Sequence, residues 1–526
     1  MQYGIMGAIS AVSAVLLTLM GGKIMQILQL SSYRAKGVRE WFVSTKWGYM
    51  LRYFAVAFFA SICMIVFVGC FGRYKYVAPF GLLFYAAHAL AFIIIAAREK
   101  CKTPLHVTPR IVRLCVCSAV LFAGASFGVL LGGSYTPVQY GFLGVLPLLV
   151  PCIVLAAHYV LLPWETLNNL RYERKARKKL QSMPSLIKIG ITGSYGKTSA
   201  KNILAAMLQS KHNVLVTPAS FNTPLGIAKT VNYRLTAEHN VFIAEMGARY
   251  TGDIARLCKL VQPQIGMLTA VGNQHLATFG SKENIAAAKY ELVKGLASDG
   301  WTVFSADNEI TREMYDRTAT EKYSAGGIEG ADVSYSDVTF GKDGTTFRLC
   351  YGEQNVLVTT QLLGRHIPSL VSLCAAVALR LGVTLQQIVS VVRDLPPVEH
   401  RLQKIENGDV TVLDDAYNSN VQGARIALEV LHAFDGTRIV ITPGLVELGE
   451  EEEAANFALG ESVFAAADYA YFVGGRAETL KAGALHAGMA ADNVFVCATL
   501  DDAVKQSGAI AGKKTILFEN DLPDNL

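Results

Sequence analysis

Five stretches of about 20 residues that contain no Lys, Arg, Asp or Glu occupy the first third of the sequence. An apolar helix of about that length can cross the hydrocarbon core of a bilayer. The stretches run approximately over residues 3–22, 53–71, 77–97, 114–133 and 141–162. A chain that begins in this way does not fold as an ordinary globular protein. We therefore predict an α-helical membrane domain over residues 1–164, with five transmembrane helices.

Charge is divided unevenly along the chain. Residues 1–184 contain 19 Lys and Arg but only 4 Asp and Glu, whereas the whole chain of 526 residues has a net charge of +6. The rest of the chain is therefore acidic and offers no basic footprint for a phosphate backbone, so no nucleic-acid partner is expected. Hydrophobic residues make up 52% of the chain and charged residues 17%, which excludes a disordered protein.

The loops between the apolar stretches predict the topology. Segments 23–52, 98–113 and 163–180 are rich in Lys and Arg, whereas the loops between them, 72–76 and 134–140, carry only Arg73 and Lys75. Basic loops stay on the cytoplasmic side of a membrane. We expect a multi-pass protein of the plasma membrane with its N-terminus outside and everything after residue 163 in the cytoplasm. Segment 165–184 reads as a basic juxtamembrane linker, helical and attracted to anionic membrane lipid.

From residue 185 onward, short β-branched runs alternate with helical periodicity. This alternation is typical of parallel sheets with helices on both faces. We predict two α/β domains, a central one over residues 185–394 and a Rossmann-like one over residues 395–526. A turn-rich region near 324–362 predicts a small antiparallel insertion in the first of them.

The strongest local motif is Gly193-Ser194-Tyr195-Gly196-Lys197-Thr198, which follows a predicted strand and precedes a predicted helix. Glycines allow backbone N–H groups to curl around phosphates, Lys197 can neutralise phosphate charge, and the Thr198 hydroxyl can bind Mg²⁺. The match is imperfect because Ile191 stands where the general pattern has glycine. The strand–loop–helix context favours a nucleotide site over an ordinary turn.

Further polar residues follow predicted strands or lie in helices. Glu245 and His275 each end an apolar strand, at the edge where open α/β sheets bind ligands. Asp414 and Asp415 close another strand and could reach a ribose or a metal, or cap a turn. Lys289 lies in an alanine-rich helix, where a lysine is expected to be solvated.

Taken in order, these segments resemble the Mur ligase superfamily, the ATP-dependent peptide ligases of cell-wall precursor synthesis, and within it the MurF branch that adds D-alanyl-D-alanine. The resemblance covers residues 185–515 and rests on "TGSYGKTSAKN", "FIAEMGARYTGDIARL", "NQHLATFGSKENIAAAKYEL", "VEHRLQ", "LDDAYNSN" and "LVELGEEE". It implies a P-loop central domain, a C-terminal domain that closes on the nucleotide, and the cofactors ATP and Mg²⁺, with two metal ions.

The resemblance also implies roles for individual residues. It gives catalytic roles to Lys197, His275, Lys289 and Arg401. It gives nucleotide contacts to Gly193, Ser194, Tyr195, Gly196, Lys197, Thr198, Ser199, Asn222, Asn308, Arg401, Asp415 and Asn418. It gives metal ligands to Thr198, Glu245, His275 and Lys289, the last as a carbamate that carries negative charge. Lys289 would then be buried in the site instead of solvated.

The implied reaction is ATP-driven amide formation through an acyl phosphate, and the implied partners are a cell-wall precursor, UDP-linked or lipid-linked, and an amino acid or dipeptide. A membrane domain stands where MurF has its UDP-binding domain, and the C-terminal strand reads "LFENDLPDNL" where a Lys-Gly-Ser-like motif is expected. Two alternatives therefore stay open. One is the same chemistry on another polymer or poly-amino acid, and the other is a nucleotide-binding transporter or scaffold.

Overall fold

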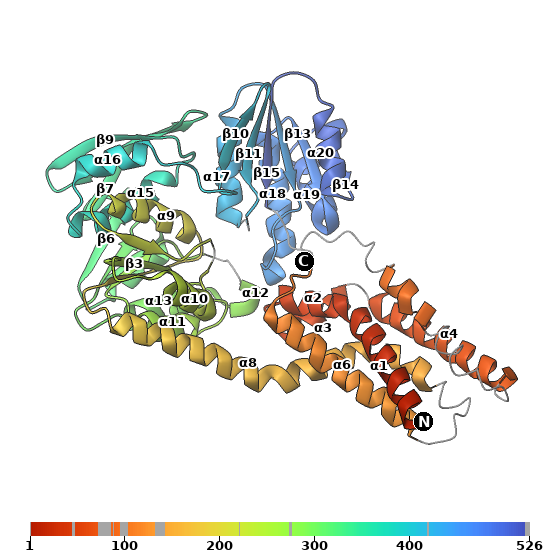
Figure 1. The fold of residues 1–526 in the computed structure, drawn as a ribbon. Helices are drawn as coiled ribbons and strands as arrows, with labels where there is room; N and C mark the ends of the chain where they lie inside the picture. The colour runs from red at the N-terminus through yellow and green to blue at the C-terminus, as the bar shows by residue number, and fades with distance from the viewer. Residues whose placement is uncertain are drawn as a thin grey trace. The chain divides into compact units, whose positions relative to one another are not determined.

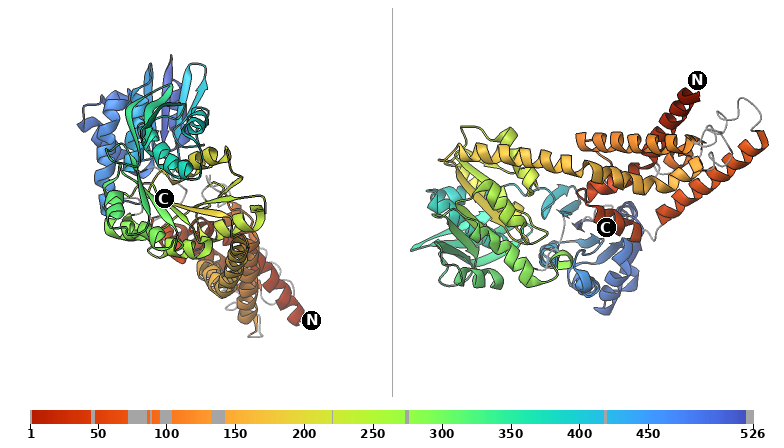
Figure 2. Two further views of the ribbon diagram at one scale, coloured as in Figure 1. Left: turned by 90° about the vertical axis from the view of Figure 1, so that its left-hand side faces the viewer. Right: turned by 90° about the horizontal axis from the view of Figure 1, so that it is seen from below.

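The computed structural model describes residues 2–44, 48–71, 86–87, 89–94, 104–131, 142–219, 221–272, 276–417 and 420–520. The chain divides into two compact units, residues up to 169 and residues 170–522 (Figure 1). One helix, α8 (Val150–Gln181), begins in the first unit and ends in the second, and it can be followed along its 32 residues in Figure 2.

The first unit consists of helices. They are α1 (Gln2–Met20), α2 (Gly22–Leu30), α3 (Ala35–Ser44), α4 (Gly48–Phe71), α6 (Pro109–Leu130), the short η1 (Leu146–Leu149) and the first part of α8. Side chains such as Leu17, Phe122 and Val154 form one buried cluster among them. An ion pair joins α6 to α8, because Arg113 Nη2 lies 2.7 Å from a carboxylate oxygen of the buried Glu165.

Among the described residues, two helical segments are long and apolar enough to cross a membrane, Pro109–Leu130 and Phe142–Gln181. A third candidate is the pair Met6–Met20 and Gly22–Leu30, which meet at a bend of 43°. The predicted span 53–71 lies within α4, and most of the predicted span 77–97 lies outside the described residues. The prediction of five spans is therefore matched only in part.

The central part of the second unit is built on a nine-stranded sheet in the order β2-β3-β1-β4-β5-β6-β7-β8-β9. The parallel strands are β1 (Ile187–Thr192), β2 (Val214–Val216), β3 (Val241–Glu245), β4 (Ile265–Leu268), β5 (Trp301–Ser305) and β6 (Lys322–Gly326). β7 (Val333–Gly341), which is parallel to β6, starts an antiparallel meander with β8 (Gly344–Tyr351) and β9 (Gln354–Thr360). The predicted antiparallel insertion is thus a continuation of the same sheet, because β7 pairs with the end of β6.

Helices cover both faces of this sheet (Figure 1). On one face lie α9 (Lys197–Gln209), α15 (Ile367–Arg380) and α16 (Leu385–Arg393), which share a buried cluster with alternate residues of β1 and β3. On the other face lie α10 (Pro224–Arg234), α11 (Asp253–Val261), α13 (Lys282–Lys294) and α14 (Glu309–Asp316). The strand–helix alternation in the sequence correctly predicted this parallel, doubly covered sheet.

The end of α8 belongs to this second cluster. Ala176 and Leu180 are buried against the sheet-covering helices, and Glu173 lies 2.7 Å from Arg256 of α11. The opposite side of the helix exposes Arg171, Arg174, Lys175 and Lys178. The predicted basic linker is therefore helical, and its one-sided charge arises because its other side packs on the central domain.

The C-terminal part of the second unit has a six-stranded sheet in the order β10-β11-β15-β12-β13-β14. Its strands are β10 (Gln403–Asn407), β11 (Val410–Asp415), β12 (Thr437–Thr442), β13 (Tyr469–Val473), β14 (Val494–Cys497) and β15 (Lys514–Glu519), all parallel except β10. α17 (Val421–His432), α18 (Glu452–Ala466) and α19 (Ala477–His486) pack on one face and α20 (Leu500–Gly508) on the other. The predicted Rossmann-like architecture is confirmed.

Candidate active site

The P-loop connects β1 to α9, as the sequence predicts. Gly193 and Gly196 both have positive φ, and a Cβ at Gly193 would lie 2.0 Å from Thr269 Oγ1. The loop therefore requires glycine where it passes this threonine. Lys197 begins α9 and its Nζ donates hydrogen bonds to the carbonyls of Gly193 and Ser194, at 2.7 and 2.9 Å. Burial lowers the pKa of Lys197 to about 8.

A segment that follows β4 holds the loop from the other side. Ser194 N donates to Ala270 O at 2.6 Å, and Thr269 Oγ1 donates to Tyr195 O at 2.6 Å. Ser194 Oγ also accepts a hydrogen bond from Gly272 N at 3.0 Å. These hydrogen bonds fix the backbone of the loop at the N-terminus of α9, where a phosphate can bind.

The Glu245 carboxylate lies at the end of β3, beside the first turn of α9. Thr198 Oγ1 donates to Glu245 Oε2 at 3.0 Å, and Asn222 Nδ2 donates to Glu245 Oε1 at 3.2 Å. Glycine at position 247 leaves room for the Asn222 side chain, because a Cβ there would lie 2.7 Å from Asn222 Cγ. Three residues that the resemblance assigns to the site, far apart in the sequence, thus meet at this carboxylate.

Lys289 of α13 is buried, with 3% of its surface exposed. The expectation of a solvated lysine, based on its position in a helix, is therefore wrong. Lys289 lies on the same side of α13 as the buried Ile285 and Leu292, and this side packs on the sheet. Burial, and then the nearby charge of Lys197, lower the pKa of Lys289 to about 7.

The C-terminal domain contributes a second set of charged groups. Arg401 stacks over the Tyr417 ring, with its guanidinium carbon 4.3 Å from the ring centroid, and donates to Tyr417 O at 3.1 Å. Asp415 ends β11 and accepts a hydrogen bond from Leu402 N at 3.1 Å. Burial raises the pKa of Asp415 to about 6 although Arg401 opposes the shift, and burial lowers the pKa of Arg401.

A cavity of about 470 Å³ is lined by residues of both the central and the C-terminal domain. It is lined from the central domain by Tyr195, Gly196, Ser199 and Asn308, and from the C-terminal domain by Arg401 and Asp415. Asn308 also caps the N-terminus of α14 by accepting from Thr311 N, and its Nδ2 donates to Val271 O. A cavity of this size with convergent polar groups fits a small ligand.

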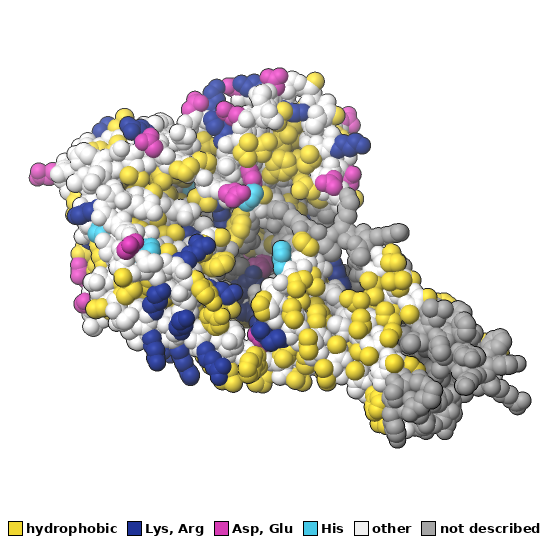
Figure 3. Space-filling view, viewed as in Figure 1, with side chains coloured by type: hydrophobic (Ala, Val, Ile, Leu, Met, Phe, Trp, Pro, Cys, Tyr) yellow, Lys and Arg dark blue, Asp and Glu magenta, His cyan; other side chains and the backbone are white. Residues whose placement is uncertain are grey.

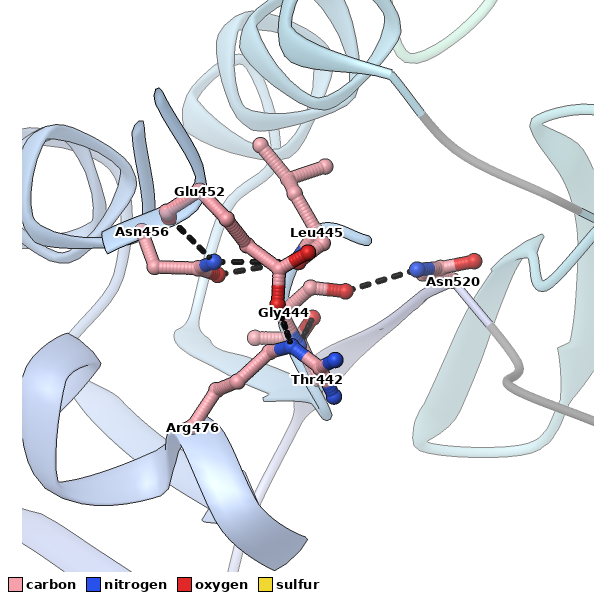
Figure 4. Close-up of polar contacts among 7 residues, drawn as sticks. All are labelled: Thr442, Gly444, Leu445, Glu452, Asn456, Arg476 and Asn520. Atoms are coloured by element: carbon pink, nitrogen blue, oxygen red, sulfur yellow. Dashed lines mark hydrogen bonds and ion pairs between the residues drawn. The ribbon is translucent and has the colours of Figure 1, made fainter. Parts of the chain in front are cut away.

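Several hydrogen bonds hold the loop that follows β12 in the C-terminal domain (Figure 4). Asn456 is buried and clamps the loop backbone, since its side chain accepts from Leu445 N at 2.8 Å and donates to Leu445 O at 3.0 Å. Asn520 Nδ2 donates to Gly444 O at 2.6 Å, and Arg476 Nε donates to Glu452 Oε1 at 2.7 Å. The loop leads to Glu447, whose carboxylate lies 3.9 Å from Arg249 of the central domain.

The structure brings together most of the residues assigned to the site, and two lie outside the residues it describes. These two are His275 and Asn418, and the functional role of every assigned residue stays a prediction. Residue-level reasoning missed Lys201, which is buried beside Glu245, and His366, which lines the cavity. Burial lowers the pKa of His366 to about 4, so its imidazole is neutral at neutral pH.

The residues at Glu245 fit a magnesium ion. Mg²⁺ prefers hard oxygen ligands and is commonly held by one or two carboxylates together with phosphates and water. Glu245 and the Thr198 hydroxyl supply such oxygens beside the P-loop. Within the described part of the chain there is no cluster of three or more His, Cys, Asp or Glu side chains that could hold a metal ion.

Comparison with known families agrees with this geometry. Residues 191–378 match the Mur ligase middle domain, and residues 400–518 match the Mur ligase glutamate ligase domain. Together the two matches span more than half of the sequence. The chain belongs to the Mur ligase family. Neither match reaches the first 190 residues, which include the helical unit.

Curated relatives of this Mur ligase include UDP-N-acetylmuramoyl-tripeptide--D-alanyl-D-alanine ligases. That of Mycobacterium tuberculosis is 35% identical over 285 residues, covering 52% of this chain and 55% of the relative. That of Escherichia coli K12 is 32% identical over 289 residues, covering 54% of this chain and 64% of the relative. The chain thus spans between about half and two thirds of the length of these relatives.

Solved structures of MurF show the same fold. A MurF from Acinetobacter baumannii superimposes with a TM-score of 0.61 at 25% identity, covering 67% of this chain and 77% of that one. The MurF ligase of Thermotoga maritima in complex with ADP gives a TM-score of 0.60 at 25% identity, covering 67% and 80%. The predicted family resemblance is therefore confirmed.

Proposed function

We propose that this chain is an ATP-dependent ligase that forms an amide bond on a cell-wall precursor. The observation that carries the proposal is a cavity lined by Tyr195 and Gly196 of the P-loop and by Arg401 and Asp415 of the C-terminal domain. A P-loop alone would fit many nucleotide-binding proteins. A ligase needs residues of a second domain beside the P-loop, because the nucleotide and the substrates must be held between the two domains.

In the proposed reaction a carboxylate oxygen of the precursor attacks the γ-phosphate of ATP, and ADP leaves. The amine then attacks the acyl phosphate, phosphate leaves, and an amide bond is formed. The barrier comes mainly from crowded negative charge, so positioned cations are the main contribution that the protein can make. Two such cations are Lys197, whose Nζ bonds to P-loop carbonyls, and Arg401, which lines the cavity.

Thr198 and Glu245 would hold Mg²⁺, with His275 and Lys289 completing a second metal position as the resemblance implies. A bound magnesium ion would offset phosphate charge. We further propose that Lys289 carries a carbamate. The support is its burial together with a pKa of about 7, because only a neutral amine reacts with CO₂.

The substrates in this proposal follow the relatives. The MurF enzymes named above act on a UDP-N-acetylmuramoyl-tripeptide and on D-alanyl-D-alanine, and we propose the same class of acceptor and amine for this chain. Release of phosphate from ATP should then require both partners. Phosphate release that proceeds at the full rate without an amine would contradict the ligase assignment and favour a nucleotide-driven transporter or scaffold.

We also propose that the first unit is embedded in a membrane, with the ligase domains in the cytoplasm. Many large apolar side chains of this unit are exposed, including Val15 at 58%, Phe59 at 57% and Val120 at 65% (Figure 3). In water such an apolar surface would promote aggregation, whereas in a bilayer it would contact lipid. The basic residues of the C-terminal half of α8, which gather at the edge of the second unit in Figure 3, agree with a cytoplasmic side.

Polar contacts within the first unit support this topology. Gln29 Nε2 donates to His106 O at 2.8 Å, Arg110 stacks 3.7 Å from the Tyr33 ring centroid, and Arg113 pairs with Glu165. The three segments predicted to be cytoplasmic thus meet at one end of the helices. Reporter fusions at residues 137 and 184 should report opposite sides, and a cytoplasmic signal at 137 would contradict the five-span topology.

A further inference from the structure

Lys201 is a lysine in the core of the central domain. It lies on the same side of α9 as the buried Leu204 and Leu208, and only 1% of its side chain is exposed. A buried ammonium group is strongly destabilising unless it is paired and hydrogen-bonded. The P-loop motif does not account for this lysine, because it lies one helical turn beyond Lys197 and points into the protein.

The Lys201 ammonium joins three elements. Nζ donates to Ala219 O, in the segment after β2, at 2.5 Å. It also lies 3.1 Å from Oε2 of Glu245, whose side chain is 2% exposed. Ala219 has a φ of +42°, a strained conformation for a residue with a Cβ, which the surrounding contacts must maintain. α9, the strained segment and the end of β3 are therefore held at one point.

The two carboxylate oxygens of Glu245 have different partners. Oε2 accepts from both Lys201 and Thr198, whereas Oε1 accepts from Asn222. The backbone N–H of Glu245 donates to Thr217 Oγ1 at 3.1 Å. The buried cation therefore fixes one oxygen of the carboxylate from inside the protein, and the plane of the carboxylate is set by partners on both oxygens.

We propose that Lys201 is a positioning residue, a buried cation that keeps the Glu245 carboxylate at the end of β3 in the orientation that a magnesium ion needs. This inference rests on the proposed function, in which Glu245 is a metal ligand. Lys201 itself has no access to the phosphates, because its ammonium is enclosed by Ala219 and Glu245. Its role is thus distinct from that of Lys197.

A double-mutant cycle tests the pairing without any ligand. Lys201→Met leaves a buried carboxylate without its cation, and Glu245→Gln leaves a buried cation without its carboxylate. The double variant removes both charges. In the full-length protein in detergent, we expect each single variant to melt below the wild type and the double variant to melt above at least one single variant. Additive losses, or a double variant that does not fold, would overturn the proposal.

The exposed pair of Lys342 and Asp435 is the matched control. Its atoms are closer, at 2.7 Å, but the side chains are 49% and 71% exposed. Exposed ion pairs contribute little to stability. The cycle of Lys342→Met and Asp435→Asn should therefore be additive.

Metal binding separates positioning from a purely structural role. Mn²⁺ binding, followed by electron paramagnetic resonance with a non-hydrolysable ATP analogue, should need about tenfold more metal in Lys201→Met, a loss of about 1.4 kcal/mol. Unchanged or tighter binding in that variant would overturn the proposal, because removal of a cation without loss of positioning favours the metal. If the wild type binds no Mn²⁺ with the nucleotide, the proposed function fails while the cycle still reports on the pair.

Discussion

Replacing Lys289 by methionine separates the stability of this residue from its proposed chemistry. Lys289 has 3% of its surface exposed and a pKa of about 7, lowered mainly by burial and then by Lys197. An ordinary lysine has a pKa of about 10.4. At pH 7.5 about three quarters of the Lys289 amine would be neutral, against about 0.1% of an ordinary lysine. The amine that reacts with CO₂ is therefore several hundred-fold more abundant at this position.

The same shift has a cost to folding. Because the pKa is lower in the folded protein, the unfolded chain binds more protons between pH 7 and pH 10, and stability rises with pH across this window. At pH 7.5 the cost is on the order of 4 kcal/mol in the absence of CO₂ and metal. Lys289→Met removes it. We expect this variant to melt at a higher temperature than the wild type in CO₂-free buffer at pH 7.5, with the gap closing toward pH 10.

Activity should change in the opposite direction. Lys289→Met and Lys289→Ala should lose most of the ligase activity, and short carboxylic acids should partly restore Lys289→Ala by taking the place of the carbamate. Activity of the wild type should fall when dissolved CO₂ is removed, and ¹³C-labelled bicarbonate should give a carbamate resonance that is absent from Lys289→Met. A fully active Lys289→Met, or a wild type indifferent to CO₂, would refute the reasoning.

Two further substitutions follow from the geometry of the site. Lys197→Ala should lower phosphate release by about a hundredfold or more, and it should not lower the melting temperature at pH 7.5, because burial lowers the pKa of Lys197 to about 8 and its charged form costs stability there; retained turnover would remove the P-loop from the account. Gly247→Ala would place a Cβ 2.7 Å from Asn222 Cγ, so we expect a displaced Asn222 and a higher Mg²⁺ requirement for activity, whereas an unchanged requirement would show that Asn222 does not orient Glu245.

The site residues that could be predicted from the sequence are those that belong to a short local motif. Gly193 to Thr198 and Glu245 each lie where a strand ends, so a strand pattern and a polar residue suffice to place them. Lys289 shows the limit. A lysine in a helix is usually solvated, and only the spacing to Ile285 and Leu292 indicates that it shares their buried side.

Residues that act through tertiary contacts leave little trace in the sequence. Lys201 has the same spacing to Leu204 and Leu208, but its partners Ala219 and Glu245 come from segments that only the folded sheet brings together. Asn456 likewise bonds to Leu445, 11 residues before it. An asparagine within a helical sequence pattern gives no indication that its side chain bonds to the backbone of a distant loop. The antiparallel meander was recognised, but pairing of β7 with β6 depends on sheet order, which local patterns do not encode.

The central claim, amide formation through an acyl phosphate, can be tested directly by the fate of the carboxylate oxygen. The purified full-length protein is given ATP, the amine and a precursor whose acceptor carboxylate carries ¹⁸O at both oxygens, and the products are analysed by mass spectrometry. The account predicts a new amide bond and one ¹⁸O atom in each phosphate released. Phosphate that contains only oxygen from ATP or water, with no amide product, would contradict it.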